Sequence, residues 1–367
     1  MSEPRIAVDV RPLCHPGTGI YRNTYEILRR MCEMGGQWFL YSPQPYDKTL
    51  FCRGNVHHRV AGVPSRLRAA QLGQLFFPVW AKCDAVDVFW SPRHQLPLLL
   101  SARIPSVVTI NDLVWLRYGE TMRFPGRQIE TFLMPRSMKQ AQAVIAISEF
   151  TREEIERQYP HLSEKLRVVT CASHLPAEIE TSAEGARAYF LFVGTMEPRK
   201  NLPRLIRAYK RYVENCPAPK ELKIVGGQGW GEVGVAQLIQ SLSLGRYARV
   251  IGKVGERALG QLYADAHALV MPSLYEGFGL PVAESLSQGV PVITSRDSAM
   301  EEVAGEAAIL VDPFSEQSIY EGLMEMTVNT ELHSALSKRA SEEIQRYDWD
   351  VSARKMFKIL NECSRTE

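Results

Sequence analysis

The stretch PSLYEGFGLPVAE, residues 272–284, carries most of the information about the fold of this chain. It follows the apolar run 268–271, which is typical of a buried parallel strand. Its glycines allow the backbone to approach a ligand closely, and Pro281 suits the first turn of a helix that Gly289 would end. The first amides of such a helix have no partner within the helix, so a strand, a glycine loop and a helix start together favour an anionic ligand.

Two carboxylates accompany this loop. Glu276 lies within the loop and Glu284 lies one turn into the helix, so both can face the same ligand. A phosphate favours backbone amides, whereas a carboxylate accepts hydrogen bonds from hydroxyl groups, so the combination indicates a ligand such as a nucleotide sugar. An acidic residue near a helix start also complements the helix dipole without any ligand, and the loop alone leaves both interpretations open.

Apolar strands alternate with helical segments along the whole chain. Predicted strands span residues 6–10, 38–41, 86–90, 106–110, 143–147, 189–193, 221–225, 249–251, 268–271, 291–294 and 308–311. Predicted helices include residues 21–34, 149–159 (with Ser148 as N-cap), 202–215 and 317–326. This alternation predicts an α/β chain of two doubly wound, Rossmann-like domains that face a central cleft. The polar segment 175–185 is the predicted linker between residues 1–180 and 181–349.

The spacing of the two carboxylates carries a family resemblance. Glu276 and Glu284, with seven residues between them that include Gly-Phe-Gly-Leu-Pro, resemble the Glu-x7-Glu signature of retaining GT-B glycosyltransferases of family GT4. The similarity continues through residues 285–295 and 302–313. It implies an N-terminal acceptor-binding domain, a C-terminal nucleotide-sugar-binding domain, and a final helix within residues 350–367 that packs back on the first domain.

The resemblance also implies roles for a pair of cations. Residues 192–202, FVGTMEPRKNL, resemble the region of the family in which Arg199 and Lys200 would hold the donor diphosphate. An Arg-Lys pair is also common on solvated surfaces. Glu276 would contact the donor sugar and steady the positive charge that develops at its anomeric carbon, and Glu284 would accept the ribose hydroxyls. The remaining positions that the resemblance assigns to the nucleotide sugar are Gly17, Gly19, Gly227, Val254, Ser273, Tyr275, Gly277, Phe278, Gly279 and Leu280.

Candidate acceptor contacts come from the first domain. The tripeptide 111–113 stands where many family members have His-Asp-Leu, but this chain has Asn111, which can form hydrogen bonds and cannot titrate. Any role of that histidine in proton transfer is therefore in doubt here. Asp112 is a candidate catalytic group that would bind an acceptor hydroxyl, although it would equally well cap a turn. Asn111 and His94 are candidate acceptor-binding residues.

Composition narrows the functional classes. The net charge of +2 makes no case for nucleic acid. Seven scattered cysteines without a CxxC pair argue against a disulfide framework and against a zinc site. The Asp-x-Asp spelling at 348–350 comes too late in the chain for a diphosphate-bound metal ion. We therefore expect no metal and no cofactor beyond the nucleotide-sugar co-substrate.

The donor and the acceptor follow from a looser resemblance. The chain, including its start IAVDVRP at residues 6–12, resembles bacterial enzymes that add mannose or a 6-deoxy-mannose from a GDP-sugar to lipid-linked O-antigen or exopolysaccharide. Three alternatives stay open: a UDP-sugar-dependent transferase of the same family, a nucleotide-sugar 2-epimerase of GT-B shape, and a non-catalytic glycan- or nucleotide-binding subunit.

The expected location is the cytoplasm, because the N-terminus lacks the apolar core of a signal peptide. Residues 1–180 carry a net charge of +5 and residues 181–367 a net charge of −3, so the first half could lie against anionic lipid or a phosphate-bearing acceptor. The segment 64–80 mixes cations with large apolar residues. It indicates either peripheral contact with the inner membrane or, more simply, a core-facing helix with a basic outer face.

Overall fold

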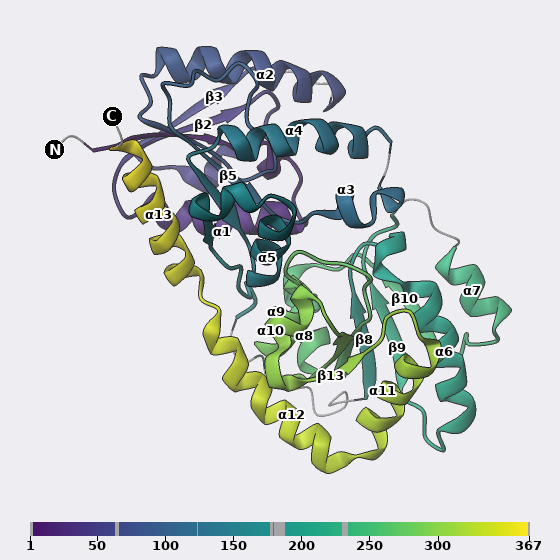
Figure 1. The fold of residues 1–367 in the computed structure, drawn as a ribbon. Coiled ribbons are helices and arrows are strands. Elements are labelled where there is room, and N and C mark those ends of the chain that lie inside the picture. The colour runs from purple at the N-terminus through teal and green to yellow at the C-terminus, as the bar shows by residue number, and fades with distance from the viewer. Residues whose placement is uncertain are drawn as a thin grey trace. The chain divides into compact units, whose positions relative to one another are not determined.

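The computed structural model describes residues 3–62, 66–122, 124–176, 179, 188–229 and 234–365, with side chains in the second helix from residue 72 onward. The chain divides into two compact units (Figure 1). Unit 1 contains Met1–Leu116, Phe124–Cys171 and Asp348–Glu367, and unit 2 contains Arg117–Arg123 and Ala172–Tyr347. Most of the predicted linker, residues 175–185, falls outside the described residues.

Unit 1 is built on a seven-stranded parallel sheet of order β3-β2-β1-β4-β5-β6-β7. Its strands are β1 (Arg5–Asp9), β2 (Gln37–Ser42), β3 (Val56–Val60), β4 (Val88–Ser91), β5 (Ser106–Ile110), β6 (Ala143–Ala146) and β7 (Leu166–Val168). Its helices are α1 (Gly19–Met31), α2 (Arg66–Cys83), α4 (Gly126–Gln140), α5 (Glu149–Gln158) and α13 (Trp349–Ser364), and the short α3 (Val114–Arg117) runs from unit 1 into unit 2.

Unit 2 is built on a six-stranded parallel sheet of order β10-β9-β8-β11-β12-β13. Its strands are β8 (Tyr189–Val193), β9 (Glu221–Val225), β10 (Ala248–Gly252), β11 (Ala266–Met271), β12 (Val292–Ser295) and β13 (Ala308–Val311). Its helices are α6 (Leu202–Asn215), α7 (Val235–Ser241), α8 (Glu256–Ala264), α9 (Leu280–Leu286), α10 (Ala299–Ala304), α11 (Glu316–Val328) and α12 (Thr330–Glu343), and a 3-10 turn, η5 (Pro198–Lys200), precedes α6.

Both sheets reverse their strand order at one point. In unit 1 the chain moves outward from β1 through β2 to β3, then crosses back to β4 on the other side of β1. Unit 2 repeats this topology, and there the reversal lies between β8 and β11. Loops leave such adjacent strands in opposite directions, which opens a crevice at the carboxyl ends of the strands where doubly wound sheets bind ligands. The topology therefore marks one expected binding position in each unit.

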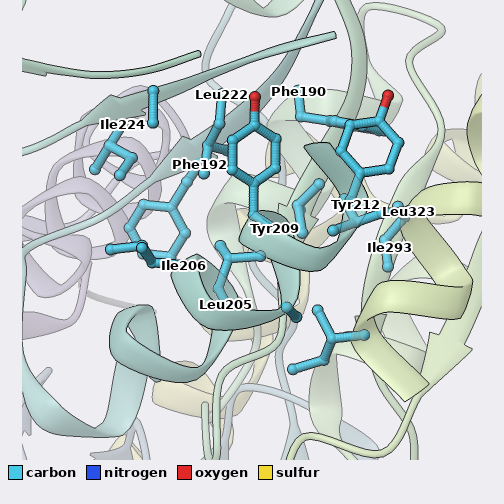
Figure 2. Close-up of a cluster of buried hydrophobic side chains, with 14 of the residues drawn as sticks. Phe190, Phe192, Leu205, Ile206, Tyr209, Tyr212, Leu222, Ile224, Ile293 and Leu323 are labelled. Carbon is cyan, nitrogen blue, oxygen red and sulfur yellow. The ribbon is translucent and has the colours of Figure 1, made fainter. Parts of the chain in front are cut away.

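The core of unit 2 explains why the site-bearing strands hold their register. Each residue of β11 is buried, as expected for a parallel strand that is covered on both faces. Figure 2 shows Leu205, Ile206 and Tyr209 of α6 packed toward β8 and β9. The buried Tyr209 hydroxyl donates to the carbonyl oxygens of Lys220 and Tyr247, so the polar tip of this core residue has acceptors.

The doubly wound, two-domain prediction is confirmed, and it missed two strands. The missed strands, β3 and β7, lie at the two edges of the sheet of unit 1. The β3 sequence VHHRV has three consecutive polar residues in its centre, and β7 has only three residues, so neither forms the continuous apolar run that marks a central strand. The last helix, α13, packs against α1 and belongs to unit 1 although it closes the chain.

Candidate active site

The loops after β8 and β11 are joined at the reversal point of unit 2. Asn201 adopts a left-handed backbone conformation (φ 61°) directly after η5. Its Nδ2 donates to the carbonyl oxygens of Pro272 at 2.9 Å and of Pro313 at 2.7 Å. The Leu274 amide donates to the Arg199 carbonyl oxygen at 2.7 Å. These bonds fix the η5 turn beside the loop that follows β11.

Glu276 lies between the two predicted cations. Arg199 Nη1 is 2.7 Å from Glu276 Oε2, and Lys200 Nζ is 2.5 Å from Glu276 Oε1. The other amino group of Arg199 donates to Glu197 at 2.9 Å, and its Nη1 also donates to the Tyr275 carbonyl oxygen at 3.1 Å. Glu276 and Lys200 are only 9% and 6% exposed. The structure therefore brings Arg199, Lys200 and Glu276 into one buried cluster.

Burial and charge act in opposite directions within this cluster. Burial alone would raise the pKa of Glu276, but the adjacent Arg199 and Lys200 outweigh burial and lower that pKa to about 2. Burial lowers the pKa of Lys200 below its ordinary value despite the neighbouring Glu276. Burial raises the pKa of Glu197, and the opposing effect of Arg199 and Lys200 offsets this rise only in part. Glu276 is thus an ionised carboxylate held in a largely dry environment.

The lowered pKa of Glu276 predicts a specific acid sensitivity. A carboxylate whose pKa falls on folding stabilises the native state above its unfolded pKa, near 4.5, and loses that contribution as the pH falls towards 2. The shift corresponds to about 3 kcal/mol of unfolding free energy. We expect the thermal midpoint of the wild type to exceed that of Glu276→Gln at pH 6 and the difference to shrink towards pH 2. Parallel pH profiles of the two proteins would contradict the ion-pair assignment.

Glu284 has its own partners in unit 2. Gly279, at φ 103°, sits at the N-cap of α9, where an added Cβ would lie 2.9 Å from Met300 Cγ. Glu284 follows within the helix, with Oε2 accepting from the Tyr263 hydroxyl at 2.7 Å and Oε1 lying 3.1 Å from His174 Nδ1. Each carboxylate oxygen has a second lone pair, so these partners orient Glu284 and leave acceptor capacity for further hydroxyl groups.

The other predicted residues of this loop differ in their surroundings. The Ser273 side chain is fully buried and its hydroxyl has no partner among the described residues. The Tyr275 ring lies 5.8 Å from that of Tyr118, centroid to centroid. Phe278 packs edge-on against Tyr347, which is a core contact. Of the remaining positions, Gly277 is buried and Leu280 is partly exposed at the start of α9.

The glycine loop after β9 is explained by close backbone contact. A Cβ on Gly226 would lie 1.9 Å from the Gly194 carbonyl oxygen, and one on Gly227 would lie 2.5 Å from Lys253 Cε. Only glycine therefore fits at Gly226, where the loops after β8 and β9 approach each other. Val254, just after β10, is partly exposed.

The remaining sequence-predicted residues lie in unit 1. Gly17 has φ 83°, and the neighbouring Thr18 caps α1 by accepting from the Tyr21 amide at 3.1 Å, with Gly19 as the first helical residue. Asn111 is buried at the end of β5 and donates to the Pro92 carbonyl oxygen at 3.2 Å.

Asp112 and His94 also lie at strand ends of unit 1. Asp112 accepts from the Val114 amide at 3.1 Å, so it caps the following turn, as its structural interpretation requires. Since it is only partly buried, it also remains open to solvent on another side. His94 follows β4, is buried, and lies 3.4 Å from Glu130.

The described residues include no cluster of metal ligands and no membrane-spanning helix. Within the described parts of the chain, no group of three or more histidine, cysteine, aspartate or glutamate side chains is arranged to hold a metal ion. Asp348 caps α13 by accepting from the Val351 amide, and Asp350 pairs with Arg30. None of the described helices is long and apolar enough to span a bilayer.

Sequence reasoning missed several side chains that surround the predicted residues: Glu197, Asn201, Tyr263, His174 and Glu130. Glu197 and Asn201 flank the Arg-Lys pair, and the left-handed turn that Asn tolerates was a usable signal. Tyr263 and His174 approach Glu284, and Glu130 approaches His94, from segments that are distant in sequence, and no local pattern marks these three residues.

Two models of known protein families match this chain. Residues 178–343 match a family model described as glycosyl transferases group 1, and residues 17–172 match one described as glycosyltransferase family 4. Together the two matches account for most of the chain.

Similar proteins cover nearly the full length. The chain is 27% identical to O-antigen chain mannosyltransferase B of Escherichia coli, over 94% of this chain and 96% of that protein. It is 28% identical to O-antigen chain mannosyltransferase RfbU of Salmonella typhimurium, with the same shares covered. The fold is similar to that of sucrose-phosphate synthase from Thermosynechococcus elongatus, with a TM-score of 0.78 at 18% identity, covering 98% of this chain and 99% of that one.

Proposed function

Because this chain belongs to the group 1 and family 4 glycosyltransferases, we propose that it transfers mannose or a 6-deoxy-mannose from a GDP-sugar to a lipid-linked glycan such as O-antigen. The observation that carries the proposal is the buried cluster of Arg199, Lys200 and Glu276 at the strand-order reversal of unit 2. The names of the two O-antigen mannosyltransferases support the sugar and the acceptor class.

The cluster suits the breaking of a sugar–diphosphate bond. Negative charge grows on the departing diphosphate, and the fixed cations Arg199 and Lys200 would stabilise it more in the transition state than in the ground state. Positive charge develops at the anomeric carbon, and the ionised Glu276 would stabilise that charge. When no donor is bound, Glu276 partly neutralises Arg199 and Lys200. Binding of the donor would place its diphosphate against these two cations. The backbone amides of Gly279 and Leu280 would meet the sugar or the phosphate.

The proposed stereochemistry is retention. The departing phosphate would take the proton of the acceptor hydroxyl on the same face from which it leaves. Asn111 is compatible with this route, which needs no titratable base at that position. Proton NMR of the product of a GDP-α-sugar tests the proposal: an α-linkage supports it and a β-linkage contradicts it.

The donor base is tested by calorimetric titration of the purified protein. We expect GDP to bind at least about tenfold more tightly than UDP, and we expect transfer from GDP-mannose only when a glycan acceptor is present. Tighter binding of UDP than of GDP would indicate that the sugar donor is a UDP-sugar. Release of an epimerised sugar nucleotide in the absence of an acceptor would show that the protein is an epimerase and not a transferase.

The proposed reaction needs no metal ion. Arg199 and Lys200 supply the positive charge that a divalent ion provides on the diphosphate in metal-dependent transferases. EDTA should therefore leave the rate of the purified protein unchanged. A strong loss of rate that manganese reverses would contradict this part of the proposal.

We also propose that unit 1 contacts the cytoplasmic face of an anionic membrane through α2, α4 and the loop after β4. Six apolar side chains there are 43 to 66% exposed: Leu75, Val79, Leu98, Leu99, Ile129 and Phe132. The loop lies against both helices, because the Leu98 amide donates to Gln74 and the Leu96 amide donates to Ser137. The two helix sequences contain six basic residues and only one acidic residue, Glu130. This excess of positive charge complements anionic lipid.

Vesicle binding tests this surface. We expect the protein to cosediment with phosphatidylglycerol vesicles, and we expect the double variant Leu98→Ser/Leu99→Ser to bind at least about tenfold more weakly, because two exposed leucines no longer insert. Val328→Ser, at a 59% exposed position in unit 2, is the matched control and should bind as the wild type does. Equal binding of the double variant would contradict the assignment of this surface.

A further inference from the structure

The strand-order reversal of unit 1 also carries a polar cluster. It lies between β1 and β4, and the residues at the ends of these strands include Asp9, Arg11, Arg93 and His94. Asp9 and Arg11 neutralise each other, because Arg11 Nε lies 2.9 and 3.0 Å from the two Asp9 oxygens and both residues are buried. The same topological rule that marks the cluster of unit 2 therefore marks this position for a second ligand.

Arg93 and His94 keep unused hydrogen-bond donors at this position. The partly buried Arg93 guanidinium has no hydrogen bond or ion pair to the described residues. His94 Nδ1 lies 3.4 Å from Glu130 Oε2, while Gln95 Nε2 donates to Glu130 Oε1 at 2.9 Å. His94 Nε2 is buried and lacks a partner within the described part of the chain. Buried donors without an acceptor are unfavourable, so a ligand atom is expected there.

The protonation of His94 follows from the groups around it. Burial lowers its pKa, but Glu130 and, to a lesser extent, Asp112 outweigh burial and Arg93, and the pKa of His94 is raised above its ordinary value. Burial would raise the pKa of Glu130, yet His94 and Arg93 lower it. The raised pKa extends the pH range over which His94 is protonated and its Nε2–H can donate, compared with an isolated histidine.

We propose that Arg93 and His94 form an acceptor subsite for a neutral, hydroxylated sugar ring. This inference rests on the proposed transferase function. The two side chains would donate to hydroxyl oxygens of the ring, and Asp112 would accept from a neighbouring hydroxyl. The ligand is expected to be neutral because the cluster balances its charges: Asp9, Glu130 and Asp112 offset Arg11, Arg93 and His94. A phosphate would require an excess of cations, which the cluster lacks.

Separate readouts for donor and acceptor test the subsite. With octyl α-D-mannopyranoside as the acceptor probe, His94→Gln should raise the acceptor KM by about 10- to 100-fold, the usual effect of losing one charge-assisted hydrogen bond. The slow hydrolysis of GDP-mannose without acceptor should change less than twofold. His57→Gln, at an exposed histidine of β3, is the matched control. An unchanged KM, or an equal loss of hydrolysis and transfer, would overturn the proposal.

The pH profile distinguishes recognition from a structural role. As the pH rises above the raised pKa of His94, its Nε2 loses the proton that it would donate to the acceptor. The acceptor KM of the wild type should therefore rise over this pH range. Glu130→Gln removes the main charge that raises this pKa, so the rise should begin at lower pH. Identical profiles would overturn the proposal.

Saturation-transfer NMR separates this inference from the transferase assignment. Octyl α-D-mannopyranoside should give ring-proton signals with the wild type and with His57→Gln, and weaker signals with His94→Gln. This result would support the subsite even if GDP-mannose were not the donor. Equal signals from all three proteins would overturn the subsite and leave the transferase assignment intact.

Discussion

Replacing Glu276 by glutamine should lower kcat by about 10²- to 10³-fold and change the donor KM much less. The substitution preserves size and removes the negative charge that would stabilise the reacting anomeric carbon. An electrostatic group that acts mainly in the transition state typically contributes this much to the rate. Steady-state rates with GDP-mannose and an acceptor glycan measure the effect.

The position of Glu276 sharpens the interpretation. Its loss also removes the carboxylate that Arg199 and Lys200 share, so the diphosphate of GDP should bind the variant at least as tightly as the wild type. Glu331→Gln, at an exposed position in the first turn of α12, is the matched control and should retain full activity. Full activity of Glu276→Gln would show that this carboxylate takes no part in the reaction and would contradict the proposed role of Glu276.

Replacing Lys200 by methionine should lower kcat/KM for the donor by about 10²- to 10³-fold. The linear methionine side chain fills much of the buried volume, so the fold should persist, while one of the two cations on the leaving diphosphate is lost. Both kcat and donor affinity should fall, because the cation contacts the diphosphate before and during bond breaking. Initial rates over a range of GDP-mannose concentrations separate the two contributions.

A nearby lysine provides the control. Lys210 lies on α6 and pairs with Glu214 near the surface, 3.1 Å away, so Lys210→Met makes the same chemical change outside the cluster. Its activity should stay within twofold of the wild type. Comparable losses in Lys200→Met and Lys210→Met would show that general destabilisation, and not contact with the diphosphate, explains the effect.

Much of the fold could be predicted because parallel strands leave a strong local signal. The strands at 106–110, 189–193, 221–225 and 308–311 have the predicted bounds, since each is a short segment rich in apolar residues between helical segments. The 202–215 helix was also predicted in full, because its buried residues recur with helical spacing. Helix ends elsewhere differ by a few residues, where capping decides the boundary: α1 starts at Gly19 because Thr18 caps it.

The candidate site was predictable only where its residues are close in sequence to a recognisable loop. Arg199, Lys200 and Glu276 follow the strands that border the reversal point, so a topology argument brings them together. Tyr263 and His174 orient Glu284 from segments that are 21 and 110 residues away, and such contacts depend on packing that no local pattern records. For the same reason, the contact between Glu130 and His94 could not be predicted from the sequence.

The central claim is that Arg199 and Lys200 hold the diphosphate of the donor, and calorimetric comparison of GDP with GMP tests it most directly. GDP differs from GMP only by the phosphate that these cations would contact. We expect the wild type to bind GDP at least about tenfold more tightly than GMP, and we expect Lys200→Met to lose most of that preference. An equal preference for GDP in both proteins would contradict the claim.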